Sequence, residues 1–543
     1  MASLIKSISL KNFKGFSDEV RIDLKPITLL FGANSAGKSS ILQALQYVRE
    51  ILERNNTNPD RTLQGGEAVD LGGFLNLVHG RDPEQRIEIE IGMDVRGESI
   101  PELVPESFDE WSGSNEVYEF YNHLYTIRRS VLDVSIRLEI AWHATRETAV
   151  VTAYQVSING AWCVRLVSSA YGRDVSMQIN RDNPVFLRQQ TQAEADDEAD
   201  MDAMFADVVD EADIPAGPIP EGIGPAERKW VSDLPGILAV VRDAGLERPS
   251  SGLRSWLYGF GSALPKLDKM LEIPVSGIQG AENIYIAREF TAFLSWLTVG
   301  PAMLLRDQLQ AARYLGPLRR VPPRGFDVSL TKSEAAWSDG MAAWECLMTS
   351  SQAMLDRCSD WMQNVSRLNT GYGLQRTQVQ ERDVATGAPL GRIKPRIALT
   401  DRSGLALQPQ DVGVGISQVL PVVVAAQDEH ASLISVEQPE LHVHPAVQVG
   451  LGDLFIDGAV ERDLSFLLET HSEHLILRLL RRIREAAEAG NTDQINPDLL
   501  GVYYLANENG RITATQLPAN KEGDFDTPWP KGFFEERGEE LFS

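Results

Sequence analysis

Cysteine and basic residues are both scarce in this sequence. The three cysteines, Cys163, Cys346 and Cys358, have no metal-like spacing and cannot form a disulfide framework, which predicts a reducing, cytoplasmic setting. Lys and Arg number 51 against 77 Asp and Glu, so the formal charge is −26. Because contact with phosphates needs clustered cations, this balance argues against a broad nucleic-acid-coating surface and leaves open only a local basic groove.

Long apolar runs are missing as well. The first ten residues, MASLIKSISL, lack the apolar core of a signal peptide. The best membrane candidate, residues 290–305, is shorter than the roughly 20 residues that a spanning helix needs. Gly300 and Pro301 also interrupt it. We therefore expect no membrane association, and we interpret this run as a buried helix that breaks at the Gly-Pro pair.

The remaining pattern predicts an α/β protein with several parts. Residues 4–31 alternate like two half-buried strands and end in a buried strand, and residues 86–180 alternate like an antiparallel meander. Residues 189–227 contain no Lys or Arg, and ten acidic residues fall within 194–213, which predicts a mobile linker. Trp337, Trp344 and Trp361 have helical spacing and are interpreted as core. From about residue 396 strands and helices alternate again.

Residues 32–40, GANSAGKSS, stand between an apolar strand-like run and a helical pattern. Gly32, Gly37, Lys38 and Ser39 satisfy the phosphate-loop pattern G-x-x-x-x-G-K-[ST]. In this pattern the glycines let backbone N–H groups wrap around phosphate, the lysine reaches the β- and γ-phosphates, and the serine ligates Mg²⁺. The sequence therefore predicts ATP and Mg²⁺ as cofactors. The loop residues expected to bind them are Asn34, Ser35, Ala36, Gly37, Lys38, Ser39 and Ser40.

Two further strand ends carry candidate catalytic groups. The run LISVEQPELHVHP places Glu437 at the end of an apolar strand, where a carboxylate is beside the Mg²⁺ shell. Gln438 and Glu440 follow it. The run LLETHSEH ends a second strand near His471, whose imidazole could touch a γ-phosphate. A zinc site is disfavoured, because these histidines flank phosphate-site strands and no cysteine joins them; the histidines are His442, His444, His471 and His474.

Five segments together resemble the SMC-like branch of the ABC ATPases, and most of all the OLD-type and AAA-annotated bacterial ATPases. They are SISLKNFKGF, GANSAGKSS, DVGVGISQVLPVV, SVEQPELHVHP and LLETHSEHLI, in this order. The resemblance covers residues 1–100 and 300–515. It implies a P-loop ABC-type ATPase head, with a mixed sheet flanked by helices, an N-terminal antiparallel β part and a mainly helical insertion.

The resemblance also implies roles for individual residues. Asn12 and Lys14 match the element near the nucleotide, Glu437 matches the Mg²⁺-associated acid and metal ligand together with Ser39, and His471 matches the switch histidine. Residues 412–417, here called the signature segment, match the LSGG signature that closes over the nucleotide of a second subunit. This implies a homodimer or higher assembly. The nucleotide-contacting residues expected there are Gly413, Gly415 and Ser417.

Two positions depart from the family pattern. Gly413 replaces the signature serine, so its hydroxyl is missing or is supplied by Ser417. Gln438 stands where the catalytic glutamate is usual, and an amide can orient a water molecule but cannot accept its proton. Loss of a general base costs around 10²–10⁴-fold. We expect slow hydrolysis, with Glu440 as the substitute base or the bound state as the signal. The family's Q-loop residue is sought in residues 69–80.

We expect six parts along the chain: an N-terminal ATPase lobe 1–185, an acidic linker 186–228, a helical insertion 229–312, a connecting part 313–395, a C-terminal ATPase lobe 396–515 and a tail 516–543. The tail lacks the acid pattern of the OLD-type nuclease, so any effector is a separate protein. The leading hypothesis is an ATP-dependent switch in bacterial antiphage defence or genome maintenance. The alternatives are a nucleotide-locked scaffold that sequesters a toxin or nuclease, and a DNA-repair ATPase that uses the basic runs 314–325 and 478–485.

Overall fold

The computed structural model describes residues 3–53, 70–96, 100–103, 130–145, 147–168, 175–180, 183, 262–271, 281–328, 335–508 and 510–529, with the backbone alone for 281–290 and 335–336. The expected acidic linker lies outside these residues. Two compact units divide the chain. Unit 1 comprises Met1–Ile91, Ile140–Ala149 and Leu305–Ser543, and unit 2 comprises Gly92–Glu139 and Val150–Leu304.

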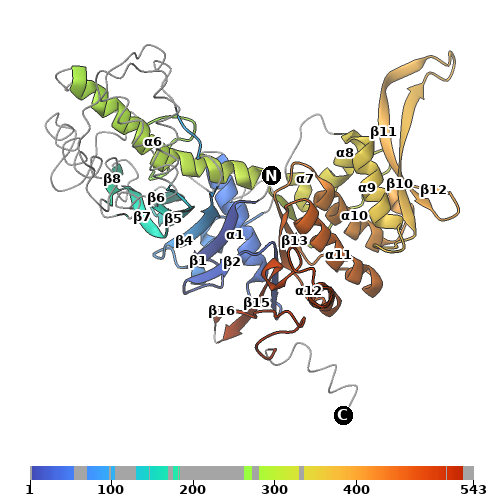
Figure 1. The fold of residues 1–543 in the computed structure, drawn as a ribbon. Helices are drawn as coiled ribbons and strands as arrows, with labels where there is room; N and C mark the ends of the chain where they lie inside the picture. The colour runs from blue at the N-terminus through green and yellow to red at the C-terminus, as the bar shows by residue number, and fades with distance from the viewer. Residues whose placement is uncertain are drawn as a thin grey trace, which may run out of the picture. The chain divides into compact units, whose positions relative to one another are not determined.

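A six-stranded sheet forms the centre of unit 1 (Figure 1). The five strands from β15 to β9 run parallel, and β16 is antiparallel to β15 at one edge. The strand β3 is buried along its whole length, as the near-continuous apolar sequence of a central parallel strand requires. The strand order is β16 (Arg511–Gln516), β15 (Leu500–Glu508), β3 (Ile27–Gly32), β14 (Ser465–Glu469), β13 (Leu433–Glu437) and β9 (Arg313–Leu315).

Four helices pack on this sheet or beside it. The helix α1 (Lys38–Glu53) contacts β3 and β14 and also β1 (Ile5–Lys11), α10 (Val414–Gln427) contacts β13 and β9, and α11 (Pro445–Glu461) contacts β14 and α12 (Glu473–Glu488). The Ser472 hydroxyl accepts the N–H of Leu475 and caps α12, and Gly490 follows its end with φ 68°. The helices expected from Pro445 and Ser472 are confirmed.

A helical layer and a long hairpin complete the described part of unit 1. The layer consists of α7 (Ala335–Ser338), α8 (Met341–Thr349) and α9 (Gln352–Gln363). Trp337, Trp344 and Trp361 are 7%, 0% and 3% exposed, so their interpretation as core is confirmed. The strands β10 (Tyr372–Arg382) and β11 (Pro389–Asp401) form an antiparallel hairpin that extends beyond these helices, with β12 (Ala406–Leu407) at its base (Figure 1).

The expected meander is present in unit 2. The strands β6 (Thr148–Ile158), β7 (Ala161–Ser168) and β8 (Val175–Ile179) pair antiparallel in sequence order. In unit 1, β1 pairs antiparallel with β2 (Val20–Asp23). The remaining described elements of the N-terminal half are α2 (Phe74–Leu77), the 3₁₀ turn η2 (His79–Arg81), β4 (Ile87–Asp94) and β5 (Asp133–His143).

The expected break at Gly300-Pro301 is wrong, because the helix α6 (Ala281–Gln310) continues through Pro301. A proline inside a helix frees carbonyls of the preceding turn. The carbonyl that loses its partner is that of Leu297, and the next one, that of Thr298, accepts a 2.6 Å hydrogen bond from the hydroxyl of Tyr154. Within the described part of the chain, no helix is both long enough and apolar enough to cross a membrane.

Candidate nucleotide site

Three adjacent parallel strands bring the predicted site residues together at one sheet edge. In the sheet register Glu437 at the end of β13 pairs with Glu469 at the end of β14, and Glu469 pairs with Leu30 of β3. The chain after β3 enters the phosphate loop within two residues. Neighbouring strands lie about 4.8 Å apart. Segments from the two ends of the sequence therefore meet at the carboxyl ends of these three strands.

The glycines of the phosphate loop hold conformations that side chains would disturb. Gly32 and Gly37 have φ of 139° and 88°, and Ser35 also lies at positive φ, 64°. A Cβ on Gly32 would lie 2.1 Å from the Leu505 carbonyl oxygen, and one on Gly37 would lie 2.6 Å from the Ile512 side chain. Because α1 starts at Lys38, the N-terminal end of this helix adjoins the loop, as an anion site requires.

Lys38 and Ser39 are placed as the motif demands. The Lys38 ammonium donates to the carbonyls of Gly32 at 3.0 Å and Ala33 at 2.9 Å, and the residue is 3% exposed. Burial lowers its pKa, while the charge of Glu469 opposes that shift. The Ser39 hydroxyl donates to Glu469 at 2.6 Å. The hydroxyl that is expected to bind Mg²⁺ therefore contacts Glu469, an acid that the sequence analysis did not include among the site residues.

Glu437 is buried next to a tyrosine. The Tyr314 hydroxyl donates to its carboxylate at 2.6 Å, and the residue is 5% exposed. Burial raises the pKa of Glu437 to about 7, against the lowering effect of the tyrosine hydrogen bond. Its carbonyl accepts a hydrogen bond from Arg319 at 2.6 Å. Gln438 follows with φ 46°, in the left-handed region that glycine favours.

Glu440 is hydrogen-bonded to the loop that carries His471. One carboxylate oxygen of Glu440 accepts the backbone N–H of His471 at 2.6 Å, and the other accepts the hydroxyl of Thr470 at 2.8 Å. Both oxygens are therefore engaged, which favours a role in holding the His471 loop over the expected role as substitute base. Burial and then the charge of Lys38 lower the pKa of His471, which favours the neutral imidazole.

Asn12 and Lys14 lie in a turn that the segment 69–80 holds in place. Both residues have positive φ, 54° and 50°. The N–H of Lys14 donates to the Leu77 carbonyl at 2.5 Å, and a ring nitrogen of His79 contacts the Lys14 carbonyl at 2.9 Å. The Lys14 ammonium contacts the Gln43 side chain of α1, and Glu437 raises its pKa against the larger effect of burial. Lys14 therefore lies beside the acids of the site.

The signature segment splits into exposed and buried positions. Gly413 is exposed and Gly415 is half-buried at the N-terminal end of α10. Ser417 is 0% exposed, and its hydroxyl has no hydrogen-bond partner among the described residues. The expectation that Ser417 presents its hydroxyl to a second subunit is therefore corrected, because one turn into the helix places this side chain on the packed face.

The residues present fit a magnesium–nucleotide complex. The loop offers N–H donors and an ammonium for phosphates, and Ser39, Glu437 and Glu469 offer the oxygen ligands that Mg²⁺ prefers. Among the described residues, no group of three or more His, Cys, Asp or Glu side chains could hold a metal ion. Mg²⁺ needs only one or two carboxylates, because substrate phosphates and water complete its shell.

Sequence reasoning missed three residues that the structure places at the site. Glu469 was visible in LLETHSEH as an acid that ends a strand, the same signal that identified Glu437. Tyr314 and Arg319 stand in the run YLGPLRR, a basic cluster that could lie near the nucleotide or the dimer seam but whose individual residues were given no role. Their partner Glu437 is 123 and 118 positions away, so no local pattern connects them.

Comparison with known proteins agrees with the motifs. Residues 4–100 match the family described as "AAA ATPase domain", and residues 318–478 match "AAA domain, putative AbiEii toxin, Type IV TA system". No curated protein matches the chain.

Similar solved structures include three SMC heads. One is an SMC head bound to the C-winged helix domain of ScpA, with 12% identity over 95% of this chain and 98% of that chain, at a TM-score of 0.37. A second, from Pyrococcus furiosus, has 10% identity over 95% and 96%, at 0.36. The head from Thermotoga maritima has 9% identity over 95% and 98%, at 0.34. Both matched segments are thus similar to AAA-type ATPase domains, and both contribute residues to the site described above.

Proposed function

We propose that this chain is an ATP-hydrolysing switch that closes as a homodimer around ATP and Mg²⁺ and controls a separate effector protein. The observation that supports it most strongly is the hydrogen bond between Ser39 and Glu469, which joins positions 430 apart at the shared strand edge. A phosphate loop that served only as a structural turn would not need an acid such as Glu469 beside its serine. The loop, the two strand-end acids and His471 form a single site.

The chemistry follows from the side chains. Bound Mg²⁺ supplies charge neutralisation for the phosphates. The loop N–H groups and Lys38 orient the phosphate chain, and Ser39, Glu437 and Glu469 are the oxygen donors for the ion. Gln438 orients a water molecule without accepting its proton, so hydrolysis is slow.

The dimer and the effector rest on the signature segment and on the family. Val414, at the start of α10, is 53% exposed, which leaves this helix end accessible to a second copy. The matched family of residues 318–478 carries the name of a toxin–antitoxin system, which supports control of a partner in bacterial antiphage defence or genome maintenance.

Phosphate release by three proteins tests the switch. We expect slow ATP-dependent release by the wild type, none by Lys38→Ala, and faster release by Gln438→Glu, since the glutamate restores a general base. Wild-type release that survives in Lys38→Ala would contradict the proposal. No release by the wild type, with release regained in Gln438→Glu, would favour the nucleotide-locked scaffold, for which Gln438 is the supporting observation.

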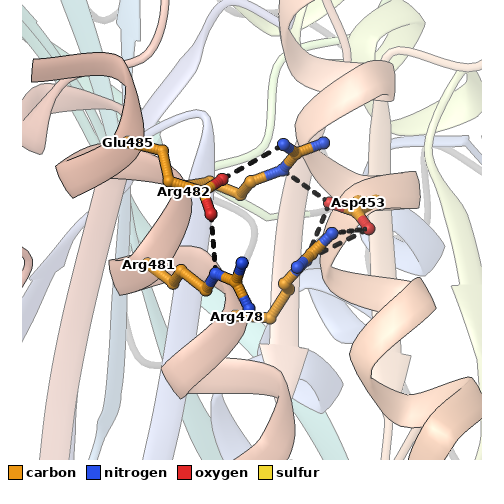
Figure 2. A network of polar contacts seen from close by, with 5 residues as sticks. All are labelled: Asp453, Arg478, Arg481, Arg482 and Glu485. Atoms are coloured by element: carbon orange, nitrogen blue, oxygen red, sulfur yellow. Dashed lines mark hydrogen bonds and ion pairs between the residues drawn. The ribbon is translucent and has the colours of Figure 1, made fainter. Parts of the chain in front are cut away.

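The DNA-repair alternative loses support from the arginines of residues 478–485. Asp453 of α11 accepts hydrogen bonds from Arg478 and Arg482 of α12, and Glu485 pairs with Arg481 and Arg482 (Figure 2). Arg478 and Arg482 therefore join α12 to α11, whereas Arg481 pairs within α12. In the other basic run, Arg320 pairs with Asp339 and Arg324 with Asp411.

A further inference from the structure

Arg319 lies between the acid-bearing strand end and the signature helix. It follows β9 and is 3% exposed. One terminal nitrogen of its guanidinium donates to the Glu437 carbonyl at 2.6 Å, and the other donates to the Gln418 carbonyl of α10 at 3.3 Å. The Gln418 side chain completes the contact, because its amide donates to the Arg319 carbonyl at 2.7 Å and accepts the Arg319 N–H at 3.2 Å.

The peptide that Arg319 holds is the one that sets the position of Gln438. The Glu437 carbonyl belongs to the peptide bond between Glu437 and Gln438. Gln438 has φ 46°, a conformation that costs a non-glycine residue energy and persists only when its neighbours fix it. Its own N–H donates to the Glu469 carbonyl at 2.8 Å. The Gln438 carbonyl accepts the N–H of Leu441 at 3.1 Å. Arg319 therefore supplies one of the hydrogen bonds that flank this strained residue, and the one that comes from a side chain.

The same stretch of chain is tied to α10 a second time. Arg324 pairs with Asp411, and the Gln410 side-chain amide donates to the Pro322 carbonyl. Both partners precede the first residue of α10. A shift of this helix end therefore pulls on the segment that carries Arg319, and through it on the Glu437 carbonyl.

A buried arginine is a costly way to hold a loop if holding is all it does. Removing a guanidinium from water costs several kcal/mol. The Nε of Arg319 has no hydrogen-bond partner among the described residues. Burial lowers the pKa of its guanidinium, and the charges of Glu440 and Glu437 oppose that shift. A neutral side chain could bridge the two carbonyls at a lower desolvation cost. The positive charge of Arg319 therefore indicates a role toward the acids of the site.

We propose that Arg319 is a positioning residue that couples the signature helix to the Glu437–Gln438 peptide. A change in the position of α10, such as its engagement by a second copy, is transmitted through Gln418 and Arg319 to the group that orients the attacking water. This inference rests on the proposed function of the site. The inference assigns Arg319 a role within a single copy of the chain, through the backbone carbonyl of Glu437 and not through its carboxylate.

The test uses the full-length chain with three variants and one matched control. Arg319→Gln removes the charge, Arg319→Lys keeps it but loses the two-pronged reach, and Gln418→Met breaks the link to α10 and leaves the Glu437 contact. Arg320→Gln is the control, because Arg320 is the adjacent arginine and is exposed. ATP affinity is measured with a fluorescent ATP analogue, assembly by ATP-dependent sedimentation, and turnover by phosphate release.

We expect Arg319→Gln and Gln418→Met to bind ATP within about threefold of wild type while ATP-dependent assembly and turnover fall by about tenfold or more. Arg319→Lys should be intermediate, and Arg320→Gln unchanged. Wild-type assembly and turnover in both Arg319→Gln and Gln418→Met would overturn the inference. A loss that merely follows weaker ATP binding or a lower melting temperature would overturn it too. If the wild type itself binds no ATP, the proposed function fails first, and this inference falls with it.

Discussion

Glu437 is a buried acid for which the proposed role as a Mg²⁺ ligand requires the anion. Burial raises its pKa from 4.5 to about 7, so the folded protein keeps a proton that the unfolded chain has already released. Stability from this group therefore falls as pH rises through that window. The shift corresponds to roughly 3 kcal/mol. We expect Glu437→Gln to raise the melting temperature of the metal-free protein at pH 8 and to abolish Mg²⁺–ATP binding.

Melting curves in chelator between pH 5 and 8 measure this effect. The gap between wild type and Glu437→Gln should open as pH rises, because the glutamine still accepts the Tyr314 hydroxyl but carries no charge. Glu508→Gln, on an exposed position, serves as the control. A gap that is constant across pH would show that the charge of Glu437 is not what destabilises the protein.

Single residues were predictable where the chemistry is written in adjacent positions. Lys38, Ser39 and Glu437 each sit in a local motif with a fixed spacing, and the structure places them at one edge. Arg319 and Tyr314 depend on contacts across more than a hundred positions. The burial of Ser417 was not predicted, because the sequence places it near the start of a helix without showing which face of that helix is packed.

At the scale of elements, two glycines at the start of α10 are not equivalent. A Cβ on Gly415 would lie 2.7 Å from the His442 carbonyl oxygen, whereas one on Gly413 would meet no described atom within 4 Å. We expect Gly415→Ala to lower the free energy of unfolding by about 1–3 kcal/mol. Gly413→Ala should leave it within about 0.5 kcal/mol and weaken ATP-dependent assembly. Thermal melting and sedimentation separate the two effects; equal stability loss in both would contradict this.

The pairing of α11 and α12 depends on Asp453. Its side chain is 13% exposed and binds two arginines, Arg478 through both carboxylate oxygens (Figure 2). Asp453→Asn should therefore cost about 2 kcal/mol of unfolding free energy, with ATP affinity unchanged. Arg481→Gln, at a 58% exposed side chain, should cost under about 0.5 kcal/mol. Denaturant titration measures both, and a neutral Asp453→Asn would contradict the prediction.

Elements were predictable from periodicity wherever burial is regular. The apolar runs that became β3, β13 and β14 and the helices after Pro445 and Ser472 follow their patterns closely. The exception, α6, shows the limit of that reasoning. A Gly-Pro pair does not always signal a break, because the proline removes only one backbone hydrogen bond from this 30-residue helix.

For the whole molecule, the charge of −26 opposes binding to polyanions. The described arginines of residues 478–485 that face α11 are paired with acids, so few counterions would be released on contact with DNA. We expect no tight duplex binding near 0.15 M salt and a shallow dependence of affinity on salt. Titration at several salt concentrations checks this. A slope that indicates several phosphate contacts would revive the DNA-repair alternative.

The position of β3 between β14 and β15 has a consequence for synthesis on the ribosome. The 430 positions between Ser39 and Glu469 take roughly 20–90 s to translate at 5–20 residues per second. Throughout that interval the apolar strand β3 lacks both of its neighbours, β14 and β15. We therefore expect the nascent chain to depend on chaperones that cover its exposed apolar residues. Translation that stops before β14 would yield a truncated protein that contains the whole phosphate loop but lacks the two strands between which β3 folds.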